Sequence, residues 1–229
     1  MRTRSLTGKS SRNGLQNAAR PPDEYLSLDQ GKTLVHLARL AVNTCLEKNE
    51  IIKAPEDAPQ ALKERSGVFV TLTSLKPAHQ LRGCIGFPHP EEQLATATIK
   101  AAIYAATEDP RFPPVTGDEF KGNVLVEVTV LTPPRLLEVQ SPKQLPSVVE
   151  IGRHGLIVER GGNSGLLLPQ VATEWNWDAS EFLTNCCLKA GLPPDSWLVD
   201  GTKVSVFEGE IYQEIQPAGE IRRRAIGES

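Results

Sequence analysis

The stretch Asn123-Val-Leu-Val-Glu-Val-Thr-Val-Leu131 is the clearest strand signal in the chain. Its even-numbered positions from 124 to 130 are all valine, and leucine, glutamate and threonine stand between them. Successive side chains of a strand point to opposite faces, so this alternation predicts a strand with one wholly apolar face. Pro133-Pro134 ends the strand, because proline cannot donate to a sheet ladder.

The chain before this strand predicts two helices and two further strands. Apolar residues at helical spacing indicate an amphipathic helix over 28–49, with Ser27 or Asp29 placed to cap it. Alternating apolar residues predict a strand over 68–73, and a second strand is expected over 80–86. A helix then follows, which Pro90-Glu91-Glu92 opens and Asp109-Pro110 ends.

The chain after Pro134 predicts three more strands and one helix. Short strands are expected over 155–159 and 165–168, joined by a glycine-containing turn. A capping box at Asp178 and Glu181 predicts a helix that ends at Ala190. A last strand is expected from Lys203 to Glu214. This order lacks a strict alternation of strands and helices, so it predicts an α+β fold with a mainly antiparallel sheet.

The two ends of the chain have a different composition from the middle. Residues 1–24 are rich in Arg, Ser, Gly and Asn and have no apolar period, which predicts a disordered basic tail. Residues 217–229 contain Arg222-Arg223-Arg224 and are expected to form a flexible C-terminal tail. The ordered part is then a single domain over residues 25–216.

Composition and charge exclude several classes of protein. The net charge is -3, and residues 1–20 hold five of the 25 basic residues and no acid, so the rest of the chain is acidic. Nucleic acid is therefore an unlikely partner, because phosphate binding needs a basic field. No apolar run approaches the 18 or so residues of a membrane span, and no secretory signal opens the chain, so we expect a cytoplasmic protein. The four cysteines are too few for a disulfide scaffold and are expected to be reduced thiols.

The segment Leu81-Arg82-Gly83-Cys84-Ile85-Gly86-Phe87 is the first candidate site. On a strand, Arg82, Cys84 and Gly86 would share a face, so the guanidinium would favour the thiolate of Cys84. Gly83 and Gly86 would let backbone N–H groups approach a ligand, which together with Arg82 suggests an anion pocket. The general base would come from elsewhere, with His154 or His89 as candidates. The alternative is a small cysteine buried between glycines.

The segment Glu108-Asp109-Pro110-Arg111-Phe112-Pro113-Pro114 is the second candidate. It is a rigid, proline-bounded loop that fixes a carboxylate close to a guanidinium. Asp109 and Arg111 therefore contact a ligand or form a structural pair, and both alternatives stay open. The chain shows no phosphate-binding loop, dinucleotide fingerprint or metal-ligand spacing, so no metal site is expected and the cofactor is left unassigned. Trp175 and Trp177 either cover the core or present aromatic rings to a partner.

The sequence resembles the AMMECR-type domain family from about Tyr25 to Glu214. The motifs that carry the resemblance are Leu81-Arg82-Gly83-Cys84-Ile85-Gly86, Glu108-Asp109-Pro110-Arg111-Phe112, His154-Gly155-Leu156, Leu168-Pro169-Gln170 and Lys189-Ala190-Gly191-Leu192. The resemblance implies an α+β fold of two unequal lobes with a cleft lined by the Arg-Gly-Cys segment. It implies no established activity. Some relatives are fused to, or encoded beside, a Memo-like dioxygenase-fold protein and a radical SAM protein.

Two hypotheses for the function follow. In the first, the protein is an enzyme in which Cys84 is a nucleophile or redox thiol and Arg82 binds a small anionic substrate. His154 or Asp109 would then orient a group or accept a proton. In the second, Arg82, Asp109 and Arg111 form a non-catalytic recognition cleft for a ligand or a protein, acting with a Memo-like or radical SAM partner. No sequence feature indicates the oligomeric state.

Overall fold

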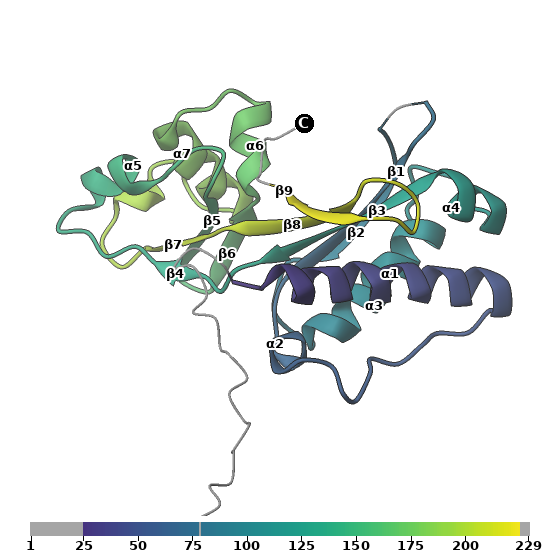
Figure 1. Cartoon of the computed structure of the whole chain (residues 1–229). Helices are drawn as coiled ribbons and strands as arrows, with labels where there is room; N and C mark the ends of the chain where they lie inside the picture. The colour runs from purple at the N-terminus through teal and green to yellow at the C-terminus, as the bar shows by residue number, and fades with distance from the viewer. Residues whose placement is uncertain (1–24, 78, 225–229) are drawn as a thin grey trace, which may run out of the picture.

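The computed structural model describes residues 25–77 and 79–224 (Figure 1). Its helices are α1 (Leu28–Lys48), α2 (Gln60–Lys63), α3 (Leu94–Thr107), α4 (Gly117–Asn123), α5 (Leu145–Val148), α6 (Pro169–Glu174) and α7 (Ala179–Lys189), with 3-10 helices η1 (Pro142–Gln144) and η2 (Ser196–Leu198). Its strands are β1 (Val68–Ser74), β2 (Gln80–Phe87), β3 (Val124–Leu131), β4 (Arg135–Leu136), β5 (Gly155–Arg160), β6 (Asn163–Leu167), β7 (Lys203–Phe207), β8 (Gly209–Glu214) and β9 (Ile221–Arg224).

The strands form two antiparallel sheets. The larger sheet has the strand order β2-β1-β3-β8-β9, and the smaller has the order β4-β7-β5-β6. Every strand pair is antiparallel. Figure 1 shows the two sheets with their helices as two lobes of unequal size. The predicted α+β fold with a mainly antiparallel sheet and two unequal lobes is therefore confirmed.

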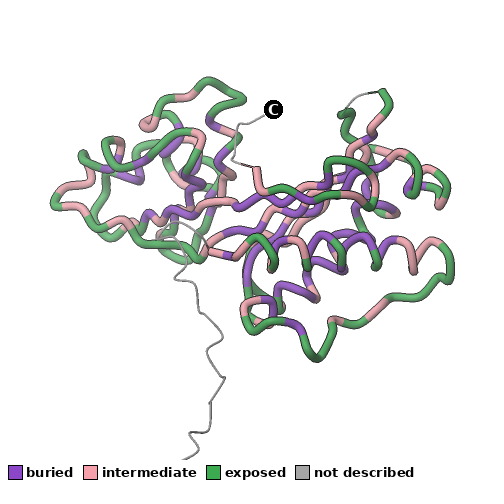
Figure 2. The backbone as a smooth tube through the Cα atoms, in the orientation of Figure 1, coloured by how far each residue is buried: buried purple, intermediate pink, exposed green. Residues whose placement is uncertain are grey.

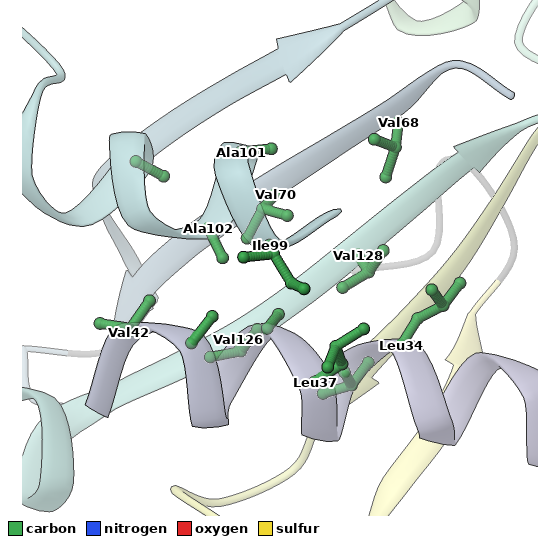
Figure 3. Close-up of a cluster of buried hydrophobic side chains, with 14 of the residues drawn as sticks. Leu34, Leu37, Val42, Val68, Val70, Ile99, Ala101, Ala102, Val126 and Val128 are labelled. Atoms are coloured by element: carbon green, nitrogen blue, oxygen red, sulfur yellow. The ribbon is translucent and has the colours of Figure 1, made fainter. Parts of the chain in front are cut away.

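The larger lobe is built on β3, the central strand of its sheet. The valines at 124, 126, 128 and 130 are fully buried, as the alternation predicted. They pack with the apolar sides of α1 and α3, which cover this face of the sheet (Figure 3). A capping box at Ser27 starts α1, and Asn49 ends it in the left-handed conformation. Figure 2 shows the buried backbone where these helices meet the sheet.

The smaller lobe is inserted into the larger one between β3 and β8. Its own core lies around Leu156, Phe182 and Trp197. The chain enters it at Thr132 and leaves it at Glu208, and these two residues are bonded to each other. The Thr132 N–H donates to the Glu208 carbonyl, and the Glu208 N–H donates to the Thr132 Oγ1, both at 2.8 Å. The two chain segments that connect the lobes are therefore hydrogen-bonded to each other, and Thr132 and Glu208 form one joint between the lobes.

The expected single strand from Lys203 to Glu214 is wrong. It is interrupted at Glu208 and divides into β7 and β8, which belong to different sheets. The physical reason is the joint, because the N–H and carbonyl of Glu208 form hydrogen bonds with Thr132 and not with a neighbouring strand. Figure 1 shows β7 and β8 running on from one another across the two lobes.

The C-terminal segment also differs from expectation. Ile221–Arg224 is not a flexible tail but strand β9, which pairs antiparallel with β8. Ile221 is buried in the large core, and Arg223 and Arg224 form ion pairs with Glu210 and Glu127. The tail predicted over residues 1–24 lies outside the described residues, as do residues 225–229. No helix in the described ranges has the length and apolarity to cross a bilayer.

Candidate functional site

A cavity of about 280 Å³ lies on the face of the large sheet that α1 and α3 leave uncovered. All five strands contribute a side chain or backbone to its lining, including Cys84 from β2, Thr71 from β1, Glu127 from β3, Ile211 from β8 and Arg224 from β9. The strand register explains why these residues meet. The face opposite the buried valines carries every second residue of each strand.

The smaller lobe completes the cavity. Residues 168–170, Leu-Pro-Gln, come from the start of α6 and line it together with the strands of the larger lobe. Figure 1 shows α6 close to the end of β9. The cavity is therefore formed by both lobes, on either side of the joint at Thr132 and Glu208.

Cys84 has three hydrogen-bond partners at the edge of the large sheet, namely Asp109, Arg111 and Thr71. Its N–H donates to Asp109 Oδ2 at 2.8 Å, and its carbonyl accepts from Arg111 Nη2 at 3.2 Å. These backbone groups point away from β1, so Cys84 and its partner Thr71 form a non-hydrogen-bonded pair, in which side chains come closest. The Thr71 hydroxyl donates to Cys84 Sγ at 3.3 Å. The sulfur therefore has a fixed position in the cavity wall.

Asp109 and Arg111 act together as a cap on this edge strand. Arg111 Nε and Nη2 donate to the two carboxylate oxygens of Asp109 at 2.9 and 2.7 Å. These bonds hold the pKa of Asp109 well below its usual range, with further N–H donors from Cys84 and Arg111 outweighing the effect of burial. Asp109 also raises the pKa of Arg111, to which the Cys84 side chain adds a smaller effect. The pair occupies the place of a neighbouring strand, and the hydrogen bonds from Arg111 disfavour protonation of Asp109.

Arg82 is held away from the sulfur of Cys84. A bulge in the pairing of β1 with β2 falls at Arg82, which has no partner in the register. Its guanidinium donates to Glu119 at 2.6 and 3.1 Å and to the carbonyls of Pro113 and Pro114. Within the described ranges, the cavity lining does not include Arg82. The guanidinium next to Cys84 is that of Arg111.

Gly83 and Gly86 serve the packing of β2. A Cβ at Gly83 would lie well inside 3.0 Å of the carbonyl oxygen of Ala105 on α3. A Cβ at Gly86 would meet the ring of Phe69, which lines the cavity. The two glycines therefore let a helix backbone and an aromatic ring approach β2. This is a different use from the expected approach of a ligand.

His154 belongs to the smaller lobe. It precedes β5, where its Nδ1 accepts the N–H of Glu150 at 3.0 Å and its Nε2 lies 4.0 Å from Glu208. It is 3% exposed, and burial lowers its pKa. No histidine of the described chain lines the cavity, so the structure brings neither His154 nor His89 to Cys84. The described residues also contain no cluster of three His, Cys, Asp or Glu side chains that could hold a metal ion.

Two charged residues in the cavity were missed by the sequence reasoning. Glu127 and Arg224 form an ion pair with a 2.9 Å separation, and their side chains are 12% and 21% exposed. The signal for Glu127 was present, because it is the one charged residue in the valine-rich strand. Arg224 gave no signal, since its position in a strand depends on pairing with β8.

The fold and the cavity define a class of protein. It is a two-lobed antiparallel α+β protein in which the smaller lobe is an insertion, and a cysteine on the edge strand lines a cavity completed by that insertion. The family model AMMECR1 matches residues 35–212 of this chain. The protein therefore belongs to the AMMECR1 family.

Relatives in archaea match nearly the whole chain. Protein PYRAB00100 of Pyrococcus abyssi is 53% identical over 198 residues, which are 86% of this chain and 96% of the relative. Protein MK0488 of Methanopyrus kandleri is 50% identical over 206 residues, or 90% and 98% of the two chains. The crystal structure of uncharacterized protein PH0010 from Pyrococcus horikoshii has a TM-score of 0.72 and 51% identity, covering 88% of this chain and all of the other.

Proposed function

We propose that the protein is an enzyme that binds a small metabolite in the cavity between the lobes and reacts with it through the thiol of Cys84. One observation carries the proposal. Among the four cysteines, all of which lie in the described ranges, Cys84 is the one whose residue lines the cavity. Cys186 and Cys187 are fully buried in the small core.

The surroundings of Cys84 suit a positioned nucleophile. Its backbone is fixed by Asp109 and Arg111, and its sulfur accepts a hydrogen bond from Thr71, so little ordering is needed at the moment of reaction. The thiolate would add its electron pair to a carbonyl carbon of the ligand. As the carbon–sulfur bond forms, the π electron pair of the C=O bond moves to the oxygen, which takes a proton from water. The thiol proton would pass to water at the mouth of the cavity, because the hydrogen bonds from Arg111 make protonation of the Asp109 carboxylate unfavourable.

The proposal is tested by native-state alkylation with iodoacetamide followed by peptide mapping. We expect Cys84 to be labelled in the folded protein, at a rate that rises with pH, because the thiolate is the reactive form. Burial raises the pKa of Cys186 to about 12 and also raises that of Cys187, so these two cysteines should stay unlabelled at pH 8. A Cys84→Ser variant identifies the labelled peptide. Labelling of Cys84 only after unfolding would overturn the proposal.

A second candidate function is a binding module that acts with a protein partner, of the Memo-like or radical SAM type that the resemblance suggests. The observation in its favour is Trp175, which follows α6 and is 68% exposed. Its ring stacks on Trp177 at 5.9 Å between centroids, with 19° between the planes. Cys84→Ser separates the two functions. A binding module keeps its full partner affinity in this variant, whereas an enzyme loses its turnover.

A further inference from the structure

The charges in the cavity do not match a simple anion. We infer that the ligand carries a zwitterionic head group, of the kind found in free α-amino acids, and that the Glu127–Arg224 pair binds it. This inference rests on the proposed function of the cavity. The two side chains come from β3 and β9 and line one cavity with opposite charges.

Electrostatics favour a ligand with both charges. A lone carboxylate would be attracted by Arg224 and repelled by Glu127, whose oxygen lies 2.9 Å from the guanidinium. A lone ammonium would meet the reverse combination. A zwitterion places an ammonium, which has three donors, on Glu127 and a carboxylate on Arg224. Both partly buried charges then keep a partner of opposite sign.

The other arginines near Cys84 do not alter this balance. Arg82 is paired with Glu119, and Arg111 is paired with Asp109, each through two hydrogen bonds from the guanidinium to the carboxylate. Each of these cations is therefore already matched by an anion of the protein. Among the described residues, the region around the sulfur therefore has no excess positive charge by which a simple anion would be selected.

The remaining lining and the distances fit a small amino acid-like molecule. Phe69, Leu131 and Ile211 give the cavity apolar walls for a hydrocarbon side chain. Cys84 and Glu127 both pair with Thr71, so two strand spacings, or about 10 Å, separate their backbones. A head group at Glu127 therefore directs the far end of the ligand toward the sulfur. A volume of about 280 Å³ lies at the small end for ligand sites and suits one metabolite.

Isothermal titration calorimetry on the full chain tests the inference with matched probes. Leucine, methionine and phenylalanine are each compared with the N-acetyl derivative, which is an anion, and with the amide, which is a cation. We expect at least one free amino acid to bind, with an affinity about tenfold or more above that of both of its derivatives, because each derivative loses a charge-assisted contact. This comparison uses the unaltered protein and so does not depend on the folding of a variant.

Three substitutions assign the preference to the pair. Glu127→Gln should remove the preference over the N-acetyl derivative, and Arg224→Gln should remove the preference over the amide. Arg222→Gln is the matched control, because Arg222 is an exposed residue of β9 outside the described cavity lining, and it should bind like the unaltered protein.

The outcomes separate this inference from the proposed function. If none of the three amino acids binds, or if the derivatives bind as tightly as the zwitterion, the inference on the head group is overturned. It is equally overturned if Arg222→Gln removes the preference as fully as Arg224→Gln. Native-state labelling of Cys84 in any of these cases leaves the proposed function standing. Labelling only after unfolding overturns the proposed function, whichever probe binds.

Discussion

Replacement of Gly83 by alanine should destabilise the protein through the contact of β2 with α3. The added Cβ would lie well inside 3.0 Å of the Ala105 carbonyl oxygen, which belongs to a helix backbone and cannot rotate away. Overpacking of this kind costs about 1–3 kcal/mol, and the lower entropy of the unfolded alanine chain returns about 0.4–1 kcal/mol. We expect a net loss of about 1 kcal/mol in the free energy of unfolding, measured by urea denaturation.

Two other glycines provide graded controls for this prediction. A Cβ at Gly86 meets the ring of Phe69, a side chain that can move, so Gly86→Ala should cost less than Gly83→Ala. Gly122 lies in α4 with no atom within 4 Å of an added Cβ, so Gly122→Ala should stabilise the protein by about 0.5–1 kcal/mol. The reasoning is refuted if Gly83→Ala is as stable as the unaltered protein, or if the three variants have the same denaturation midpoint.

Three further predictions concern buried charge, acid stability and the tryptophan pair. Arg39→Met leaves the buried carboxylate of Glu214 without its ion partner and should cost about 3–5 kcal/mol in urea denaturation, and an unchanged midpoint would contradict the prediction. The pKa of Asp109 is lowered on folding, so its stabilising effect is complete above its unfolded pKa of about 3.9 and is lost as the pH falls through that region toward the folded value. The melting temperature of Asp109→Asn should therefore fall less steeply between pH 6 and pH 3 than that of the unaltered protein. Parallel plots of melting temperature against pH would contradict this prediction. Trp175→Ala should change the free energy of unfolding by less than about 0.5 kcal/mol, because the side chain is 68% exposed. Trp177 packs on the small core, so Trp177→Ala should cost about 1–2 kcal/mol. Equal shifts of the melting temperature in the two variants would contradict this difference.

The larger lobe could be predicted mainly from local patterns. The valine alternation in β3 and the capped amphipathic helix α1 each appear within a short stretch, and the structure confirms both. The division of the last strand at Glu208 could not be predicted, because it depends on bonds to Thr132, which is distant in the sequence. The same holds for β9, whose arginine-rich sequence resembles a solvated tail until its pairing with β8 is known.

The candidate site could likewise be predicted only where it depends on residues that are close in the sequence. The sequence singled out the segments around Cys84 and Asp109, and the structure brings them into contact through a hydrogen bond from the Cys84 N–H to the Asp109 carboxylate. It could not show that Arg82 pairs with Glu119, because a bulge changes the direction of its side chain and the partner lies on another element. Nor could it bring Arg224 to the cavity, since three strands must first assemble.

The smaller lobe is formed by one continuous segment of the chain, which we call the cassette. Residues 132–208 begin and end at neighbouring points, because Leu131 of β3 lies opposite Gly209 of β8. A two-residue turn could join these strands directly into a hairpin, so the cassette can in principle be exchanged between relatives without changing the host sheet. During synthesis, β3 must wait for the whole cassette to leave the ribosome before β8 can pair with it. The host sheet is consequently completed last, although its central strand is made early.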